Sequence, residues 1–80
     1  MTEVRYTRRA SKGFERLPKP RQRQVRERIE ALAAGRRLDV RPLEGSRNAF
    51  RLRVGVYRVL FRREGDTLII EDIAPRGGAY

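Results

Sequence analysis

The sequence predicts a small α+β domain in which an N-terminal strand and a helical hairpin pack on a twisted antiparallel sheet. Three observations support this prediction. Apolar residues recur at helical spacing between residues 8 and 34, alternate with arginines between residues 50 and 61, and crowd together again between residues 67 and 73. Eighty residues suffice for one domain, so we expect it to span residues 1–80.

The amino-terminal part is predicted to form one short strand and then the first helix. Val4 and Tyr6 alternate with charged residues, as in a strand with one buried face. From about Arg8, apolar residues follow at i, i+4 and i+7 along one helical face: Ala10, Phe14 and Leu17. Gly13 weakens this helix, and Pro18-Lys19-Pro20 ends it because proline does not suit a helix interior.

The second helix is predicted to run from about Pro20 to Ala34 and to stop at Gly35. Its apolar residues fall on one stripe: Val25, Ile29, Leu32 and Ala33. Two helices with one stripe each indicate a hairpin lying on a sheet. Residues 36–48 are polar and turn-rich, and we expect them to form a connection anchored by three apolar residues: Leu38, Val40 and Leu43.

Residues 50–61 are typical of two strands joined by a tight turn. Gly55-Val56 fits the Gly-X loop of a type II′ hairpin. This loop sets the register and places six apolar residues on one face, as the pairs Val54–Tyr57, Leu52–Val59 and Phe50–Phe61. A turn at Glu64-Gly65-Asp66 leads to a third strand, Thr67 to Ile73, which we expect at the centre of the sheet because it is the most apolar. Gly65 is a candidate site for a bulge.

The same register predicts a crowded basic surface on the other face of the hairpin. Arg53 lies directly opposite Arg58, and Arg51 lies opposite Leu60. Like charges opposite each other on a sheet are destabilising. The pattern is compatible with a solvated basic face, but it favours an anion bound between the two guanidinium groups.

The charge balance indicates a polyanionic partner. Twenty basic residues stand against ten acidic ones, for a formal net charge of +10, and eighteen of the twenty are arginine. The coding bias of a GC-rich genome explains the excess of arginine over lysine. The net charge itself indicates that the partner is nucleic acid or an acidic protein. Guanidinium suits phosphate because it is a forked donor that stays charged.

The composition also excludes several kinds of chemistry. The sequence has no cysteine and no histidine, which rules out a thiolate metal site and the commonest base at neutral pH. We therefore expect no metal and no cofactor. The first ten residues show no apolar run after their charges, and no stretch approaches the roughly 20 apolar residues of a membrane helix. The expected location is the cytoplasm, with no membrane partner.

Four stretches of the chain, in order, are similar to the RelE/ParE superfamily of type II toxins. They are Glu15-Arg16-Leu17-Pro18, Leu43-Glu44-Gly45, residues 50–59 and Arg76-Gly77-Gly78-Ala79-Tyr80. The resemblance covers nearly the whole chain and implies a RelE-like microbial RNase type of fold. It also implies the activity of the RelE branch, a metal-independent endoribonuclease that cuts mRNA in the ribosomal A site and so inhibits translation.

By position, the resemblance implies catalytic roles for Arg58, Arg76 and Tyr80 and RNA phosphate binding by Arg51 and Arg53. Arginine stays protonated, so none of these four guanidinium groups can accept a proton. Tyr80 is interpreted either as a ring that stacks on a splayed base or as the proton acceptor. Asp72 or Glu71 could replace it only if the strand register points one of them at the site.

The resemblance further implies three kinds of partner: a cognate antitoxin, the ribosome with its mRNA, and operator DNA bound by the toxin–antitoxin complex. Two other functions stay open. A ParE-like toxin shares the fold but inhibits DNA gyrase; the set Arg58, Arg76 and Tyr80 favours the RelE branch, because ParE members generally lack it. A non-catalytic basic nucleic-acid-binding module is compatible with the net charge alone.

Overall fold

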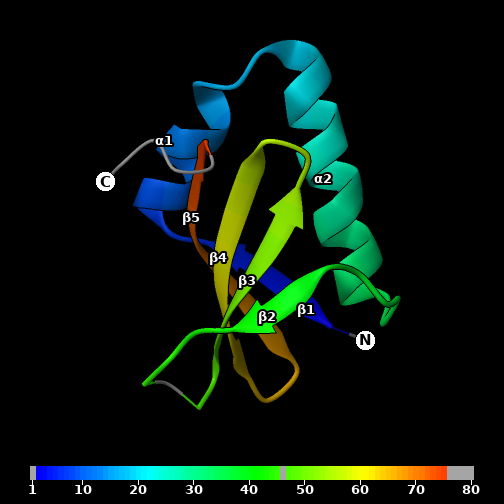
Figure 1. Cartoon of the computed structure of the whole chain (residues 1–80), viewed down its shortest axis with the longest axis vertical. Helices are drawn as coiled ribbons and strands as arrows, with labels where there is room; N and C mark the ends of the chain where they lie inside the picture. Colours follow the sequence, from blue (N-terminus) through cyan, green and yellow to red (C-terminus); the bar gives the residue numbers. More distant parts are fainter. Residues whose placement is uncertain (1, 46, 76–80) are drawn as a thin grey trace.

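The described part of the chain forms five strands and two helices, arranged in two layers (Figure 1). The computed structural model describes residues 2–45 and 47–75. The elements are β1 (Glu3–Tyr6), α1 (Arg8–Glu15), α2 (Lys19–Ala33), β2 (Val40–Pro42), β3 (Ala49–Val54), β4 (Tyr57–Glu64) and β5 (Thr67–Pro75). Figure 1 shows the helices packed against the sheet, with no helix in front of β3 and β4. The predicted α+β class is confirmed. The first helix begins at Arg8 as expected but ends at Glu15, before Leu17, and the second is shifted by one residue from the predicted Pro20 to Ala34.

The sheet has the strand order β1-β5-β4-β3-β2 and is mixed rather than wholly antiparallel. The three pairs among β2, β3, β4 and β5 are antiparallel, whereas β1 runs parallel to β5, with Glu3 beside Thr67 and Tyr6 beside Ile70. A parallel pair needs a long connection between its strands. Here the helical hairpin and three strands provide that connection.

Two expectations about the strands were wrong. Part of the predicted connection forms β2, which pairs through Val40 with Leu52 of β3. It lies at the sheet edge, where the missing N–H of Pro42 costs no ladder hydrogen bond. The most apolar strand, β5, is not central: β4 is, and β5 lies between β4 and β1. Its apolar residues are explained by α1, which packs against it.

The predicted hairpin register is confirmed at every pair, including Arg53 opposite Arg58 and Arg51 opposite Leu60. Gly55 has φ +58, as the first loop residue of a type II′ turn requires. The bulge, however, does not lie at Gly65, which has φ +60 in the β4–β5 turn. It lies where Leu60 pairs with Asp72 and the next residue, Phe61, pairs with Ile70, so Glu71 is the extra residue of β5.

One apolar core joins both helices to the inner face of the sheet. Its buried residues are Ala10, Leu17, Val25, Ile29, Leu32, Leu52, Val54, Val59, Phe61, Leu68, Ile70 and Ile73. Gly13 allows α1 to approach β5 closely, since a Cβ at this position would lie 2.2 Å from the carbonyl oxygen of Ile73. The glycine that weakens the helix locally is therefore what permits this packing. Neither helix in the described ranges is long and apolar enough to span a membrane.

Candidate nucleic-acid interface

The face of the sheet that points away from the helices carries arginines from three adjacent strands. Strand pairing places Arg41 of β2 beside Arg51 of β3, and Arg53 of β3 beside Arg58 of β4. Arg62, on the same face of β4, lies beside Ala49. We define the open face as the surface formed by these five arginines together with Leu60, Glu71 and Asp72. Arg51, Arg58 and Arg62 are half-buried, whereas Arg41 and Arg53 are exposed.

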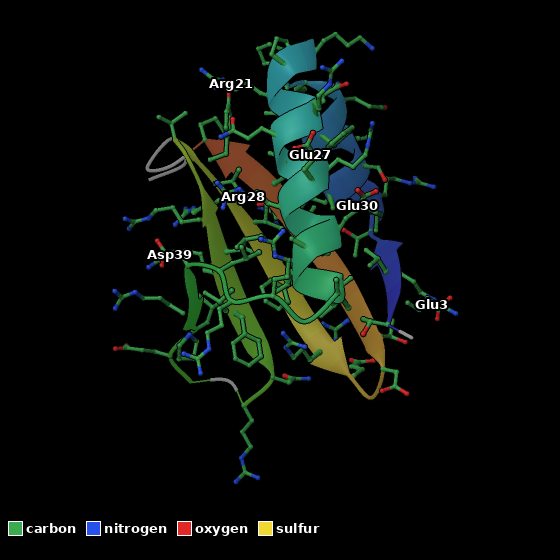
Figure 2. The ribbon with its side chains drawn as sticks, turned by 90° about the vertical axis from the view of Figure 1, so that its right-hand side faces the viewer. Glu3, Arg21, Glu27, Arg28, Glu30 and Asp39 are labelled. Carbon is green, nitrogen blue, oxygen red and sulfur yellow. The ribbon has the colours of Figure 1, made fainter. Side chains whose placement is uncertain are left out.

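Carboxylates contact two of these arginines, Arg53 and Arg62. Arg53 Nε lies 3.9 Å from Asp39 Oδ2, a loose contact between two exposed side chains; Figure 2 shows Asp39 beside β2, away from α2. Arg62 is held more closely, with Nη1 donating to Glu64 Oε2 at 2.6 Å and Nε 3.0 Å from Glu71 Oε2. The Nε–H is poorly aligned with Glu71, so that contact is an ion pair without a hydrogen bond.

The bulge brings two carboxylates onto the open face at one place. Glu71 and Asp72 are consecutive, yet both line a hollow of about 390 Å³ together with Thr7, Arg9, Leu43 and Leu60. We call this the bulge hollow. Asp72 Oδ2 lies 3.4 Å from Arg9 Nε, and the Asp72 side chain is only 20% exposed. A regular strand would have turned one of these carboxylates toward the helices.

Thr7 fixes the position of α1 against the bulge. Its Oγ1 accepts a hydrogen bond from the N–H of Ala10 at 3.1 Å, which caps the helix, and donates one to the carbonyl oxygen of Glu71 at 3.0 Å. Arg9 follows in the first turn of α1 and is thereby placed next to Asp72. Asp72 also lines a second hollow of about 540 Å³, whose lining includes Arg9, Lys12, Arg16 and Tyr57.

A third hollow lies between the helices and is more apolar. It measures about 340 Å³ and is lined by Tyr6, Ser11, Phe14, Glu15 and Arg26, whose guanidinium lies over the Phe14 ring, 5.4 Å from its centroid. Burial raises the pKa of Tyr6; Glu30 raises it further, and Arg26 opposes both. Figure 2 shows Glu30 on α2. This crevice is separate from the open face.

Three of the five predicted site residues are brought together by the sheet. Arg51, Arg53 and Arg58 all lie on the open face, within adjacent strands. Arg76 and Tyr80 lie outside the described residues, and their predicted roles stay predictions. The sequence interpretation missed three further arginines of this region: Arg9, Arg41 and Arg62. Only Arg62 had a readable signal, because the alternation of β4 continues to it from Arg58 through Leu60.

The described geometry defines a small α+β protein that presents a basic sheet face suited to a polyanion. In agreement with this, the model of the family "ParE toxin of type II toxin–antitoxin system, parDE" matches residues 4–80. The chain belongs to this family, within the RelE/ParE superfamily of toxins.

Solved structures of RelE toxins share the fold. The RelE–RelB complex of Pyrococcus horikoshii is similar with a TM-score of 0.76, 28% identity and 98% of both chains covered. The RelB–RelE antitoxin–toxin complex of Methanococcus jannaschii has a TM-score of 0.77 at 24% identity, covering 90% of this chain and 89% of that one. The isolated RelE toxin of E. coli has a TM-score of 0.84 at 12% identity, covering 99% and 88%. No curated protein sequence shows significant similarity to this chain.

Proposed function

We propose that this toxin is a ribosome-dependent mRNA endonuclease that inhibits translation until a cognate antitoxin neutralises it. The pairing of Arg53 with Arg58 across β3 and β4 carries the proposal. Like charges directly opposite each other destabilise a sheet, and an RNA phosphate bound by both guanidinium groups would offset this repulsion. A toxin–antitoxin complex is the form in which the Pyrococcus horikoshii and Methanococcus jannaschii relatives were solved, which supports an antitoxin as partner.

Cleavage is proposed to proceed by attack of the ribose 2′-OH on the adjacent phosphorus. Arg58 and Arg76 would stabilise the negative charge that develops on the phosphoryl oxygens, since a guanidinium binds two oxygens at once. Arg51 and Arg53 would hold the RNA backbone. Tyr80 would stack on a splayed base, or take part in proton transfer.

Primer extension on an mRNA under translation tests this proposal. Purified toxin should create new 5′ ends inside codons, and Arg58→Ala should reduce their rate of formation roughly 10²–10³-fold. Arg23→Ala is the matched control, because it removes the same charge from the exposed side of α2. Equal activity of the two variants would contradict the role of Arg58, and ribosome binding without any cleavage would indicate a non-catalytic binding module.

Tyr80 is tested by two substitutions in the same assay. Tyr80→Phe keeps the ring and removes the hydroxyl, whereas Tyr80→Ala removes both. Stacking predicts near-normal cleavage by the Phe variant and slow cleavage by the Ala variant. Proton transfer predicts that both are slow. Normal cleavage by both would show that Tyr80 has neither role.

Inhibition of DNA gyrase is the second candidate function, because the matching family model is that of ParE toxins. A supercoiling assay with purified gyrase separates the two candidates. Inhibition of supercoiling by the toxin, together with intact mRNA in the translation assay, would replace the proposed nuclease with a gyrase inhibitor.

A further inference from the structure

The bulge in β5 places a carboxylate where the proposed reaction needs a proton acceptor. Arg58 pairs with Ala74, and Asp72 lies two residues along β5 on the same face. Such diagonal neighbours are about 7–8 Å apart, within reach of long side chains. A phosphate held by Arg58 would therefore bring its neighbouring ribose close to Asp72.

The surroundings of Asp72 suit a group that works inside a binding site. Its side chain is only 20% exposed, and Arg9 Nε, 3.4 Å from Oδ2, holds it from one side. The bulge hollow beside it measures about 390 Å³ and has apolar walls from Leu43 and Leu60. Apolar walls with a few polar groups are typical of small-ligand sites, and here they can contact a ribose or a base.

We propose that Asp72 is a catalytic residue, the general base that removes the proton from the attacking 2′-OH. The inference rests on the proposed nuclease function. The 2′-oxygen forms a bond to phosphorus as its proton passes to Asp72, and the bond from phosphorus to the 5′-oxygen breaks. The 5′-oxygen takes a proton from water, which leaves a 2′,3′-cyclic phosphate and a 5′-hydroxyl. Asp72 then releases its proton to solvent.

Glu71, the other carboxylate of the bulge, is less suited to this role. It is 39% exposed, and its Oε2 lies 3.0 Å from Arg62, toward the end of β4 where Arg62 also binds Glu64. It is also one residue farther than Asp72 from Ala74, the partner of Arg58. Glu71 instead holds Arg62 against the sheet.

Charged and titratable groups from three elements face Asp72. They are Arg9, Lys12 and Arg16 of α1, Tyr57 and Arg58 of β4, and Glu71 of β5 itself. Four of these six groups are cations, so the surroundings of Asp72 attract the negatively charged backbone of RNA.

The test is single-turnover cleavage of mRNA in the A site of programmed ribosomes, measured with Asp72→Asn. Asparagine keeps the size of the side chain but accepts no proton. We expect the cleavage rate to fall roughly 10²–10⁴-fold, with ribosome affinity changed by less than about threefold. Asp66→Asn is the matched control, since it makes the same change at an exposed aspartate in the β4–β5 turn. The control should cleave at the normal rate.

The pH dependence separates base catalysis from a structural role. In Asp72→Asn, hydroxide must remove the proton, so the cleavage rate of this variant should rise about tenfold per pH unit between pH 6 and 9. The ratio of the unsubstituted protein's rate to the variant's rate should shrink by the same factor. A constant ratio would overturn the proposal, as would normal cleavage by Asp72→Asn. If Asp72→Asn folds poorly, the same comparison is made between Asp72→Glu and Asp72→Gln. The Glu variant should cleave faster, and equal cleavage rates would overturn the proposal. Absence of cleavage by the unsubstituted protein would instead refute the nuclease function itself.

Discussion

Replacing Gly13 with alanine should destabilise the protein, although alanine is the better helix former. Alanine in a helix interior is favoured over glycine by about 1 kcal/mol. In α1, however, the new Cβ would lie 2.2 Å from the carbonyl oxygen and 3.2 Å from the carbonyl carbon of Ile73. Non-bonded heavy atoms are ordinarily about 3.5 Å apart, so α1 would have to move away from β5 by about 1 Å.

The size of the effect follows from these two opposing contributions. Overpacking costs roughly 1–3 kcal/mol, and the upper part of that range applies because the opposing atoms are backbone that cannot change rotamer. After the helical gain of about 1 kcal/mol, the free energy of unfolding should fall by about 2 kcal/mol. In a domain of this size that corresponds to a Tm lower by roughly 8–16 °C.

Urea unfolding followed by circular dichroism measures this change. The midpoint for Gly13→Ala should move to lower urea with an unchanged m-value. Ser11→Ala, at an exposed position of the same helix, is the control and should change stability by less than about 0.5 kcal/mol. If Gly13→Ala is as stable as the unsubstituted protein, or more so, then helix propensity outweighs the contact and α1 does not pack this closely on β5.

Three further outcomes are expected. Thr7→Ala should lower the free energy of unfolding by about 2 kcal/mol, because it removes the helix cap and the hydrogen bond to the Glu71 carbonyl, whereas Thr7→Ser should keep most of the stability in thermal unfolding. Burial raises the pKa of Tyr6, so the folded protein keeps a proton that the unfolded chain loses above about pH 10. Stability should therefore fall as the pH rises past that value, and Tyr6→Phe should show a smaller fall in unfolding experiments at pH 9 and 11. Arg51→Ala and Arg53→Ala should each flatten the salt dependence of ribosome binding by about one phosphate contact; unchanged slopes in both would show that these arginines do not touch RNA.

Local signals explain which parts of the fold could be predicted from the sequence. The hairpin register was predictable because the Gly55-Val56 loop and the alternation of apolar residues constrain it independently and agree. The bulge also left a signal: the buried residues of β5 are Leu68, Ile70 and Ile73, and the step of three between the last two marks one extra residue. Interpreted only as a dense apolar strand, this spacing leaves open whether Asp72 or Glu71 points at the site.

Other features of the fold had no local signal. The parallel pairing of β1 with β5 joins residues at opposite ends of the described chain, and the sequence of neither strand indicates which strand it pairs with. β2 has three residues, too few for an alternation to be recognised. The contact between Arg9 and Asp72 depends on the close approach of α1 to β5, which appears only once the helix has packed.

The parallel pairing of β1 with β5 also dictates the order in which a newly synthesised chain can fold. Glu3 donates its N–H to the carbonyl of Asp66, and Thr7 donates to that of Ile70, so the first strand stays without a neighbour until nearly all of the described chain has been translated. Contacts so distant along the chain form late and slowly. The strand that completes the sheet also carries the two carboxylates of the bulge. A ribosome that makes this toxin therefore holds an incomplete sheet until β5 has been translated, and the open face is complete only after that point.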